Sequence, residues 1–206
     1  MPANFNNSAW FYDALGRMVY GRALINAQLF LLKFIPAGSK ILIVGGGTGW
    51  VLEEITKLHS DGLIVRYVEI APKMMALSKK RHTGANAVTF INAAVEDVPL
   101  SGDFDVVMTP FLFDNFMQGS VERIFAHLQA GLKPEGLWLN SDFQLTGKLW
   151  QSVLLKTMFW FFRIVCNIEA SKLPDIEKQF ELFGYKNIRQ KTFYGNFVSS
   201  TVYRRA

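Results

Sequence analysis

The sequence predicts an α/β fold of the doubly wound type, in which helices cover both faces of a mostly parallel sheet. Short apolar runs of strand length alternate with segments of helical periodicity along most of the chain, and glycines follow the first run at once. The chain has 206 residues, 50% of them hydrophobic, and contains no internal repeat and no linker rich in proline, glycine or serine. We therefore expect a single domain over residues 1–206.

One or two helices, followed by a strand–helix–strand unit, are expected in the N-terminal third. Apolar residues recur at mixed helical spacings over 8–34, and Pro36 then breaks the pattern. The run 41–44 is short, continuous and apolar, which is typical of a buried parallel strand. Residues 50–59 have helical character, and residues 63–68 are rich in β-branched side chains, which favours a second strand.

The same alternation predicts the rest of the sheet. A lysine–proline–glutamate–glycine turn at 133–136 precedes the fifth strand, and Gly195 and Asn196 indicate the turn of a closing hairpin. The remaining elements expected are helices over 72–81, 121–130, 147–167 and 173–183, and strands over 87–91, 104–108, 137–140, 188–194 and 197–203.

The glycines after the first strand indicate a ligand site. Gly45, Gly47 and Gly49 lie where the chain must turn sharply and where a Cβ would obstruct a ligand that approaches the backbone. A dinucleotide-binding turn needs glycine or alanine three places after the second glycine, but Trp50 stands there, which argues against a nicotinamide-dependent oxidoreductase. Glu69 ends the second strand, where a carboxylate can accept hydrogen bonds from both hydroxyls of a ribose.

Four segments in order carry a family resemblance. Residues 41–49 resemble motif I of the class I S-adenosylmethionine-dependent methyltransferases, and residues 67–72 resemble their second motif. Residues 92–99 resemble the adenine-binding segment, and residues 132–137 resemble the turn before the fifth strand. Within the family, the sequence most resembles the group that acts on small molecules such as quinones. The resemblance implies a Rossmann-like sheet of seven strands in the order 3-2-1-4-5-7-6 with the last strand antiparallel.

The resemblance also implies S-adenosylmethionine as the cofactor and a division of the single domain. Residues 1–37 are expected to form a helical lid, residues 38–143 the cofactor-binding core, and residues 144–206 an inserted aromatic helix, a further helix and the hairpin. The residues expected to bind the cofactor are Val44, Gly45, Gly46, Gly47, Gly49, Glu69, Ile70, Ala94, Val95 and Thr109.

Two positions depart from the family pattern. Ile43 stands where the family often has an acidic residue, and Ala94 stands where it commonly has an aspartate that accepts from the adenine amino group. Backbone groups, Asn92 or Glu96 are the substitutes available for that contact. These departures support the alternative of a non-catalytic cofactor-binding or interaction module.

The chemistry needs few protein groups, because methyl transfer from a sulfonium is an in-line displacement in which the cofactor carries its own leaving group. The resemblance places the substrate over the ends of the fourth and fifth strands. Asp114 and Asp142 are the candidates there for a general base, since apolar walls raise the pKa of a carboxylate, although either can instead cap the next helix. The residues expected to contact the substrate are Tyr12, Phe111 and Phe113.

Other ligands and partners are not expected. The histidines are not placed for catalysis, no metal site is expected, and Cys166 is the one cysteine, so it cannot form an intramolecular disulfide. The net charge of +5 lies in the C-terminal third, but the basic residues there are not interleaved with aromatics, so nucleic acid is not an expected partner. The first residues lack a secretory signal, and a cytoplasmic location follows.

The segment 149–168 is unusually apolar and aromatic. Lys156 and Arg163 interrupt it, and each would cost several kcal/mol at the centre of a bilayer, so a transmembrane helix is not expected. Three alternatives stay open: a core element or the face of a homodimer, the roof of a hydrophobic substrate pocket, or a helix lying on a membrane surface with Lys148, Lys156 and Arg163 facing the headgroups.

Overall fold

A computed structural model describes residues 16, 18–166 and 170–206 as one seven-stranded sheet flanked by helices. The strand order is β3-β2-β1-β4-β5-β7-β6, and β7 pairs antiparallel with both of its neighbours while the pairs among the first five strands are parallel. The predicted topology is confirmed. The strands are β1 (Lys40–Val44), β2 (Asp61–Val68), β3 (Ala85–Ile91), β4 (Phe104–Pro110), β5 (Leu132–Phe143), β6 (Tyr185–Phe193) and β7 (Val198–Arg205).

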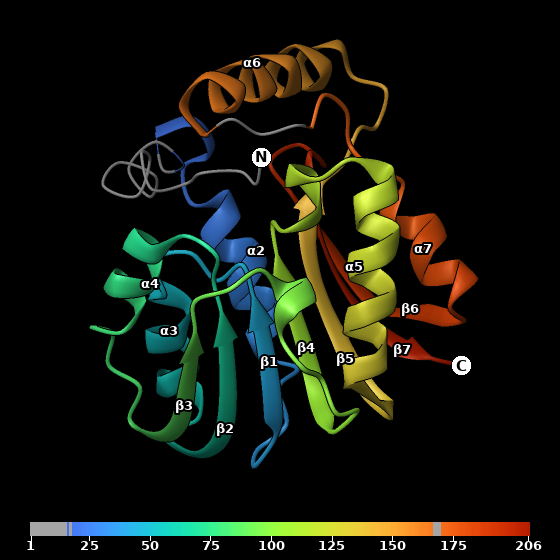
Figure 1. The fold of residues 1–206 in the computed structure, drawn as a ribbon. Coiled ribbons are helices and arrows are strands. Elements are labelled where there is room, and N and C mark those ends of the chain that lie inside the picture. Colours follow the sequence, from blue (N-terminus) through green and yellow to red (C-terminus); the bar gives the residue numbers. More distant parts are fainter. Residues whose placement is uncertain (1–15, 17, 167–169) are drawn as a thin grey trace.

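Helices cover both faces of the sheet (Figure 1). One buried apolar cluster joins α2 and α3 to one face, and a second joins α5 and α7 to the other, because the side chains of β1 and β4 alternate between the two faces. The helices are α2 (Ala23–Leu32), α3 (Trp50–Leu58), α4 (Pro72–Ser78), α5 (Gln118–Gly131), α6 (Leu149–Cys166) and α7 (Ile176–Leu182), with short 3₁₀ turns η2 (Val95–Asp97) and η3 (Phe113–Asn115).

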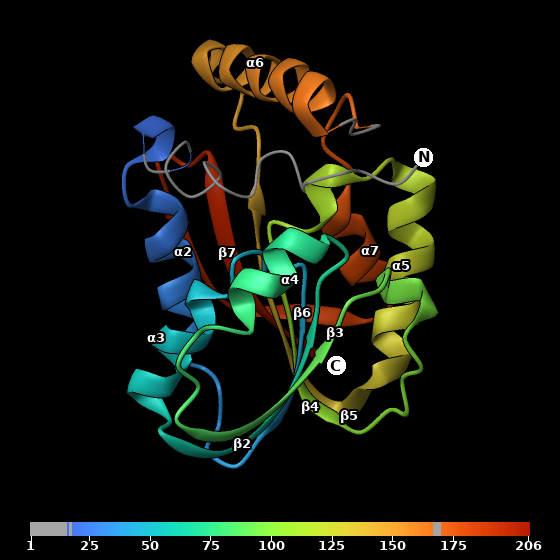
Figure 2. The same cartoon turned by 60° about the vertical axis from the view of Figure 1, so that its left-hand side comes forward.

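The helix α6 lies apart from these two layers. It crosses above the carboxyl ends of the parallel strands and does not pack along a face of the sheet (Figures 1 and 2). A third apolar cluster beneath it contains Leu155 and Phe159 of α6 together with Tyr20, Phe143 and Phe197. The ligand-binding edge expected of an open α/β sheet is thus the edge that α6 covers.

Some predicted boundaries were wrong. The turn expected at 133–136 lies inside β5, which begins at Leu132 opposite Phe104, and the register then shifts so that Val106 pairs with Leu137. Lysine, proline and glutamate at 133–135 form an exposed bulge there, which a turn-like composition permits. The helix expected over 173–183 begins only at Ile176, because the Asp175 side chain accepts a hydrogen bond from the amide of Lys178 at its start.

Candidate functional site

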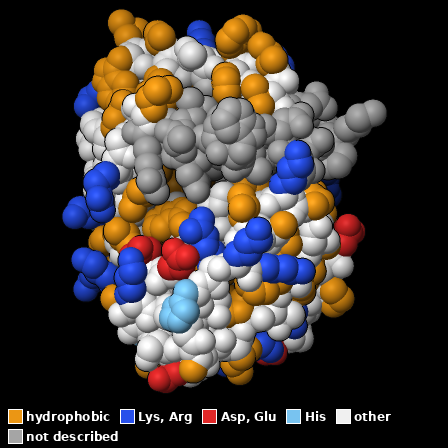
Figure 3. Space-filling model, turned by 90° about the vertical axis from the view of Figure 1, so that its left-hand side faces the viewer, with side chains coloured by type: hydrophobic (Ala, Val, Ile, Leu, Met, Phe, Trp, Pro, Cys, Tyr) orange, Lys and Arg blue, Asp and Glu red, His pale blue; other side chains and the backbone are white. Residues whose placement is uncertain are grey.

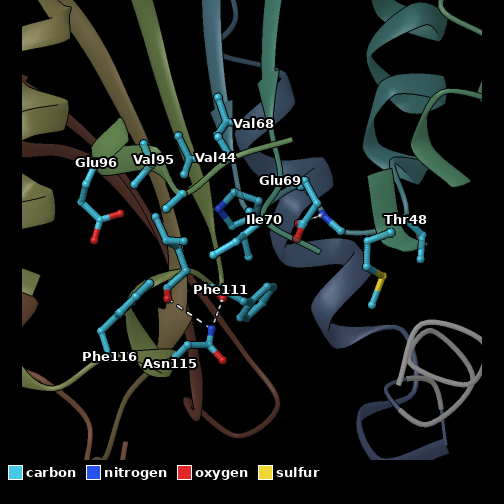
Figure 4. A pocket seen from close by; sticks show the side chains of 18 of the residues that line it. Val44, Thr48, Val68, Glu69, Ile70, Val95, Glu96, Phe111, Asn115 and Phe116 are labelled. Atoms are coloured by element: carbon cyan, nitrogen blue, oxygen red, sulfur yellow. Dashed lines mark hydrogen bonds between the residues drawn. The ribbon is translucent and has the colours of Figure 1, made fainter. Parts of the chain in front are cut away.

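A cavity of about 470 Å³ lies at the carboxyl ends of the central strands. That volume is within the usual range for small-molecule sites. Four segments supply most of its wall: the glycine loop after β1, Glu69 and Ile70 after β2, residues 93–96 after β3, and residues 110–112 and 115–117 at the end of β4 and in the turn that follows (Figure 4). Three of the four segments that carry the family resemblance therefore converge on one cavity, whereas residues 132–137 begin β5 and do not line it.

The glycine loop packs against Tyr67 at Gly46 and leaves open space at Gly47. Gly47 has a φ of +64°, and a Cβ built on it would meet no atom within 4 Å, so its backbone faces open space. A Cβ on Gly46 would lie 2.4 Å from the ring of Tyr67, whose hydroxyl donates to the carbonyl of Gly47 at 3.0 Å. Gly46 thus allows the loop to pack on β2, while Gly47 leaves room for a ligand.

Gly49, also predicted to bind the cofactor, lies away from the cavity. It does not line the cavity and instead precedes α3, where a Cβ would lie 2.6 Å from the Cβ of Ser78 in α4. Packing of α3 against α4, combined with a φ of +78°, explains the glycine without a ligand.

Glu69 is held in position beneath the loop. Its side chain is buried, Oε2 accepts from the amide of Gly47 at 3.0 Å, and Oε1 accepts from the amide of Ala71 at 2.8 Å. Burial raises the pKa of Glu69, although these two amides act in the opposite direction. Each carboxylate oxygen can accept a second hydrogen bond, so the group retains capacity for the hydroxyls of a sugar.

The segment predicted to bind adenine contributes part of the cavity wall. Ala94, Val95 and Glu96 line the cavity as its wall after β3. Asn92 does not, because its Nδ2 donates to the carbonyls of Glu69 at 2.7 Å and of Ile70 at 3.0 Å. Asn92 therefore braces the Glu69 segment, and Glu96 is the side-chain acceptor beside this wall (Figure 4).

A tight turn after β4 forms the opposite wall. Phe111, a predicted substrate contact, lines the cavity and has a φ of +53°. The Asn115 side chain donates to the carbonyls of Phe111 at 3.0 Å and of Leu112 at 3.2 Å, which stabilises the turn (Figure 4). Phe116 and Met117 extend the wall and make it largely apolar.

Thr109, a predicted cofactor contact, and Phe113, a predicted substrate contact, do not line the cavity. The Thr109 hydroxyl is fully buried between strands, where it donates to Asn140 Oδ1 at 2.8 Å and accepts from Trp138 Nε1 at 2.9 Å. Phe113 is equally buried in the core against Phe125 and Trp138. Tyr12, the third predicted substrate contact, lies outside the described residues.

Asp114 and Asp142 form a buried pair behind the turn, and neither lines the cavity. Burial and then the charge of Asp142 raise the pKa of Asp114 well above its ordinary value. Burial also raises the pKa of Asp142 to about 7, against the effect of nearby amides that include that of Phe143. The structure thus brings the two predicted carboxylates together, but on the side of the turn that faces Tyr20. Burial raises the pKa of Tyr20, and the charge of Asp114 raises it further.

Comparison with known proteins decides the family. The profile of the family described as Methyltransferase domain matches residues 41–136, which contain the first three motifs named above and all but the last residue of the fourth. A malonyl-[acyl-carrier protein] O-methyltransferase of Bacillus cereus is 30% identical over 148 residues, covering 69% of this chain and 52% of the relative. This chain carries a methyltransferase domain of the class I S-adenosylmethionine-dependent type. It spans about half the length of the curated relatives that it matches.

Solved structures show that the methyltransferase fold extends over nearly the whole chain. A methyltransferase from Aquifex aeolicus superposes with a TM-score of 0.64 at 16% identity and covers 96% of this chain and 97% of its own. The 1,6-didemethyltoxoflavin-N1-methyltransferase of Burkholderia thailandensis, solved with S-adenosylhomocysteine, gives 0.67 at 14% identity, covering 95% and 84%. At these identities the likeness concerns the fold.

Several cavity residues of this methyltransferase were missed by sequence reasoning. Gln28 reaches the cavity from α2, Met74 from α4 and Ser120 from α5, and no motif indicates any of them. Trp50 also lines it and was used only to exclude a dinucleotide turn. In the described part of the chain no helix is long and apolar enough to cross a membrane, and no group of three potential metal ligands occurs.

Proposed function

We propose that this methyltransferase binds S-adenosylmethionine in the cavity and transfers its methyl group to a small, lipophilic acceptor. The observation that carries the proposal is the division of one cavity into two walls. The open backbone of Gly47 and the buried carboxylate of Glu69 lie on one side, and the apolar turn from Phe111 to Met117 lies on the other.

The residues present fit this cofactor. Gly47 leaves space where an amino-acid group can meet backbone amides, Glu69 supplies anionic acceptors for ribose hydroxyls, and the segment from Ala94 to Glu96 suits an adenine. The bound cofactor would supply an electrophilic methyl group and its own leaving group. The chain's own contribution is to orient both reactants and exclude water, and the apolar turn is suited to both tasks.

The charge of the cavity wall limits the chemical class of the methyl acceptor. Glu69 and Glu96 are the charged side chains among the described lining residues, and no lysine, arginine or histidine accompanies them. A malonyl group, after which the Bacillus relatives are named, carries a free carboxylate, and the described cavity wall offers no cation to hold it. We therefore propose a neutral or cationic acceptor with apolar bulk.

The two buried aspartates are not needed as a base in this proposal, because they contribute no surface to the cavity. An acceptor such as a phenol or hydroquinone can release its proton to water. Asp114 and Asp142 are instead proposed to hold the turn after β4 in place.

Transfer of a tritiated methyl group from S-adenosylmethionine tests the proposal. The panel contains an alkylated hydroquinone, a hydrophobic amine and malonyl-coenzyme A as the anionic comparison. We expect label on the hydroquinone or the amine and none on the malonyl thioester. Preferential labelling of the malonyl thioester would overturn the acceptor class, and label on no member despite cofactor binding would overturn the catalytic assignment in favour of a cofactor-binding module.

A further inference from the structure

The helix α6 is apolar on two opposite faces. Its inner face carries Leu155 and Phe159, which are buried over the aromatic cluster beneath, and Met158, whose sulfur accepts from the Tyr20 hydroxyl at 3.3 Å. This face, together with Trp150 and Gln151 at the start of the helix, anchors α6 to the fold. A helix on a protein surface ordinarily turns a polar face outward, so its outer face calls for a separate explanation.

The outer face is a continuous apolar stripe. Leu149 is 85% exposed, Val153 is 65% exposed, and Trp160 and Ile164 are each 66% exposed. Spacings of four, seven and four residues place these side chains within about one sixth of a helical turn of one another. Figure 3 shows hydrophobic side chains gathered along the top of the molecule, where α6 lies. The stripe is therefore a surface that needs a partner.

The charges around the stripe are of one sign. Lys156 and Arg163 are exposed next to it on the helix, and Lys148 is exposed at its start, where Nζ donates to the carbonyl of Gly195 at 3.2 Å. No aspartate or glutamate occurs between residues 143 and 168. An exposed apolar stripe that includes tryptophan, and whose neighbouring charges on the helix are all cations, matches the chemistry of an anionic lipid surface.

We infer that α6 docks the protein on an anionic membrane surface, with the stripe in the interfacial region and the basic residues among the headgroups. A second copy of this chain fits less well, because self-association through the stripe would bring Lys156 and Arg163 near their own counterparts with no carboxylate on either helix. The helix lies on the surface and does not span it, in agreement with the absence of a membrane-crossing helix among the described residues.

Docking through α6 would bring the cavity close to the membrane. The helix crosses above the carboxyl edge of the sheet, which is also the edge that carries the cavity (Figures 1 and 2). A membrane in contact with the stripe would lie on the cavity's side of the molecule, where a lipophilic compound dissolved in the bilayer has a short path to it. Docking itself does not depend on the proposed activity.

Flotation of the full chain with vesicles tests the inference. Vesicles of phosphatidylcholine alone are compared with vesicles that contain 30% phosphatidylglycerol. We expect binding to the anionic vesicles, weakened at least tenfold by Trp160→Ser combined with Ile164→Ser. We expect a weakening of about fivefold for each charge removed by Lys156→Gln and Arg163→Gln. Leu182→Ser, which alters a leucine of α7 that is 67% exposed, should bind as the unaltered protein does.

Two controls separate the outcomes. Circular dichroism melts and binding of S-adenosylhomocysteine should be unchanged in every variant, so a failure of docking is distinguishable from a failure of cofactor binding. Anionic vesicles that do not bind the unaltered chain, or that bind the Trp160→Ser, Ile164→Ser protein equally well, would overturn the inference. A dimer in sedimentation velocity that disappears in this variant would assign the stripe to a second copy and would also overturn it.

Discussion

At the scale of single residues, the two neighbouring glycines of the loop have separate physical reasons. Gly46 is required because the ring of Tyr67 occupies the space that a Cβ would need, whereas Gly47 faces open space. A substitution at each position should therefore affect a different property: packing at the first and ligand approach at the second.

This contrast predicts the behaviour of two matched variants. Gly46→Ala should lower the free energy of unfolding by about 1–3 kcal/mol through overpacking against Tyr67. Gly47→Ala should cost about 1–2 kcal/mol, because an L-residue is strained at a φ of +64°, and should also weaken binding of S-adenosylhomocysteine. Urea unfolding and calorimetry measure both effects. Equal cofactor affinity in Gly47→Ala and the unaltered chain would contradict the assigned role of Gly47.

The raised pKa of Glu69 predicts a pH dependence of cofactor binding. Ribose hydroxyls donate to the ionised carboxylate, and burial raises the pKa of this group. Affinity for S-adenosylhomocysteine should therefore fall as the pH is lowered, beginning at a higher pH than for an ordinary glutamate, whose pKa is about 4.3. Glu69→Gln should bind S-adenosylhomocysteine more weakly at pH 8, and its affinity should change little between pH 5 and 8. A pH profile of binding that this substitution leaves unchanged would contradict the role given to Glu69.

At the scale of elements, the turn after β4 explains why the strands were predictable and the site only in part. Continuous apolar runs are sufficient to identify the buried central strands. The side-chain alternation of β4 cannot be extrapolated past Pro110, because Phe111 adopts a left-handed φ and reverses the chain. Phe111 consequently faces the cavity while Phe113 enters the core. The motifs likewise indicate Glu69, but not Gln28, which only packing of α2 brings to the site.

The Asp114–Asp142 pair joins this turn to β5 and predicts a pH dependence of stability. The pKa of Asp142 is raised to about 7, so between about pH 4 and 7 the folded chain binds more protons than the unfolded chain. The contribution to stability is present below the unfolded pKa and is lost as the pH rises through 7. Asp142→Asn removes the charge and should raise the free energy of unfolding at pH 8 by about 2 kcal/mol, with little gain at pH 5. Denaturant unfolding at both pH values checks this expectation; a loss of stability at pH 8 would mean that the carboxylate is ionised and needed there.

At the scale of the whole molecule, one edge of the sheet carries the functional features. Parallel strands end together, so the loops after β1, β2, β3 and β4 meet at one cavity, and α6 crosses the same edge.

Saturation of the cavity should then stabilise the domain as a unit. At 100 times the dissociation constant, S-adenosylhomocysteine should add about 2.7 kcal/mol, which for a chain of this size corresponds to a rise of roughly 5–10 °C in Tm. The absence of any shift in differential scanning fluorimetry would indicate that the folded cavity does not hold the cofactor.

The central claim is that Glu69 and the glycine loop bind an adenosylated cofactor, and titration calorimetry with S-adenosylhomocysteine measures this most directly. The unaltered chain should bind, Glu69→Ala should bind roughly 10- to 100-fold more weakly, and Glu122→Ala, an exposed glutamate on α5, should be unchanged. A thermal melt of each protein confirms that it is folded. No binding by the unaltered chain at millimolar ligand, or equal binding by folded Glu69→Ala, would contradict the account.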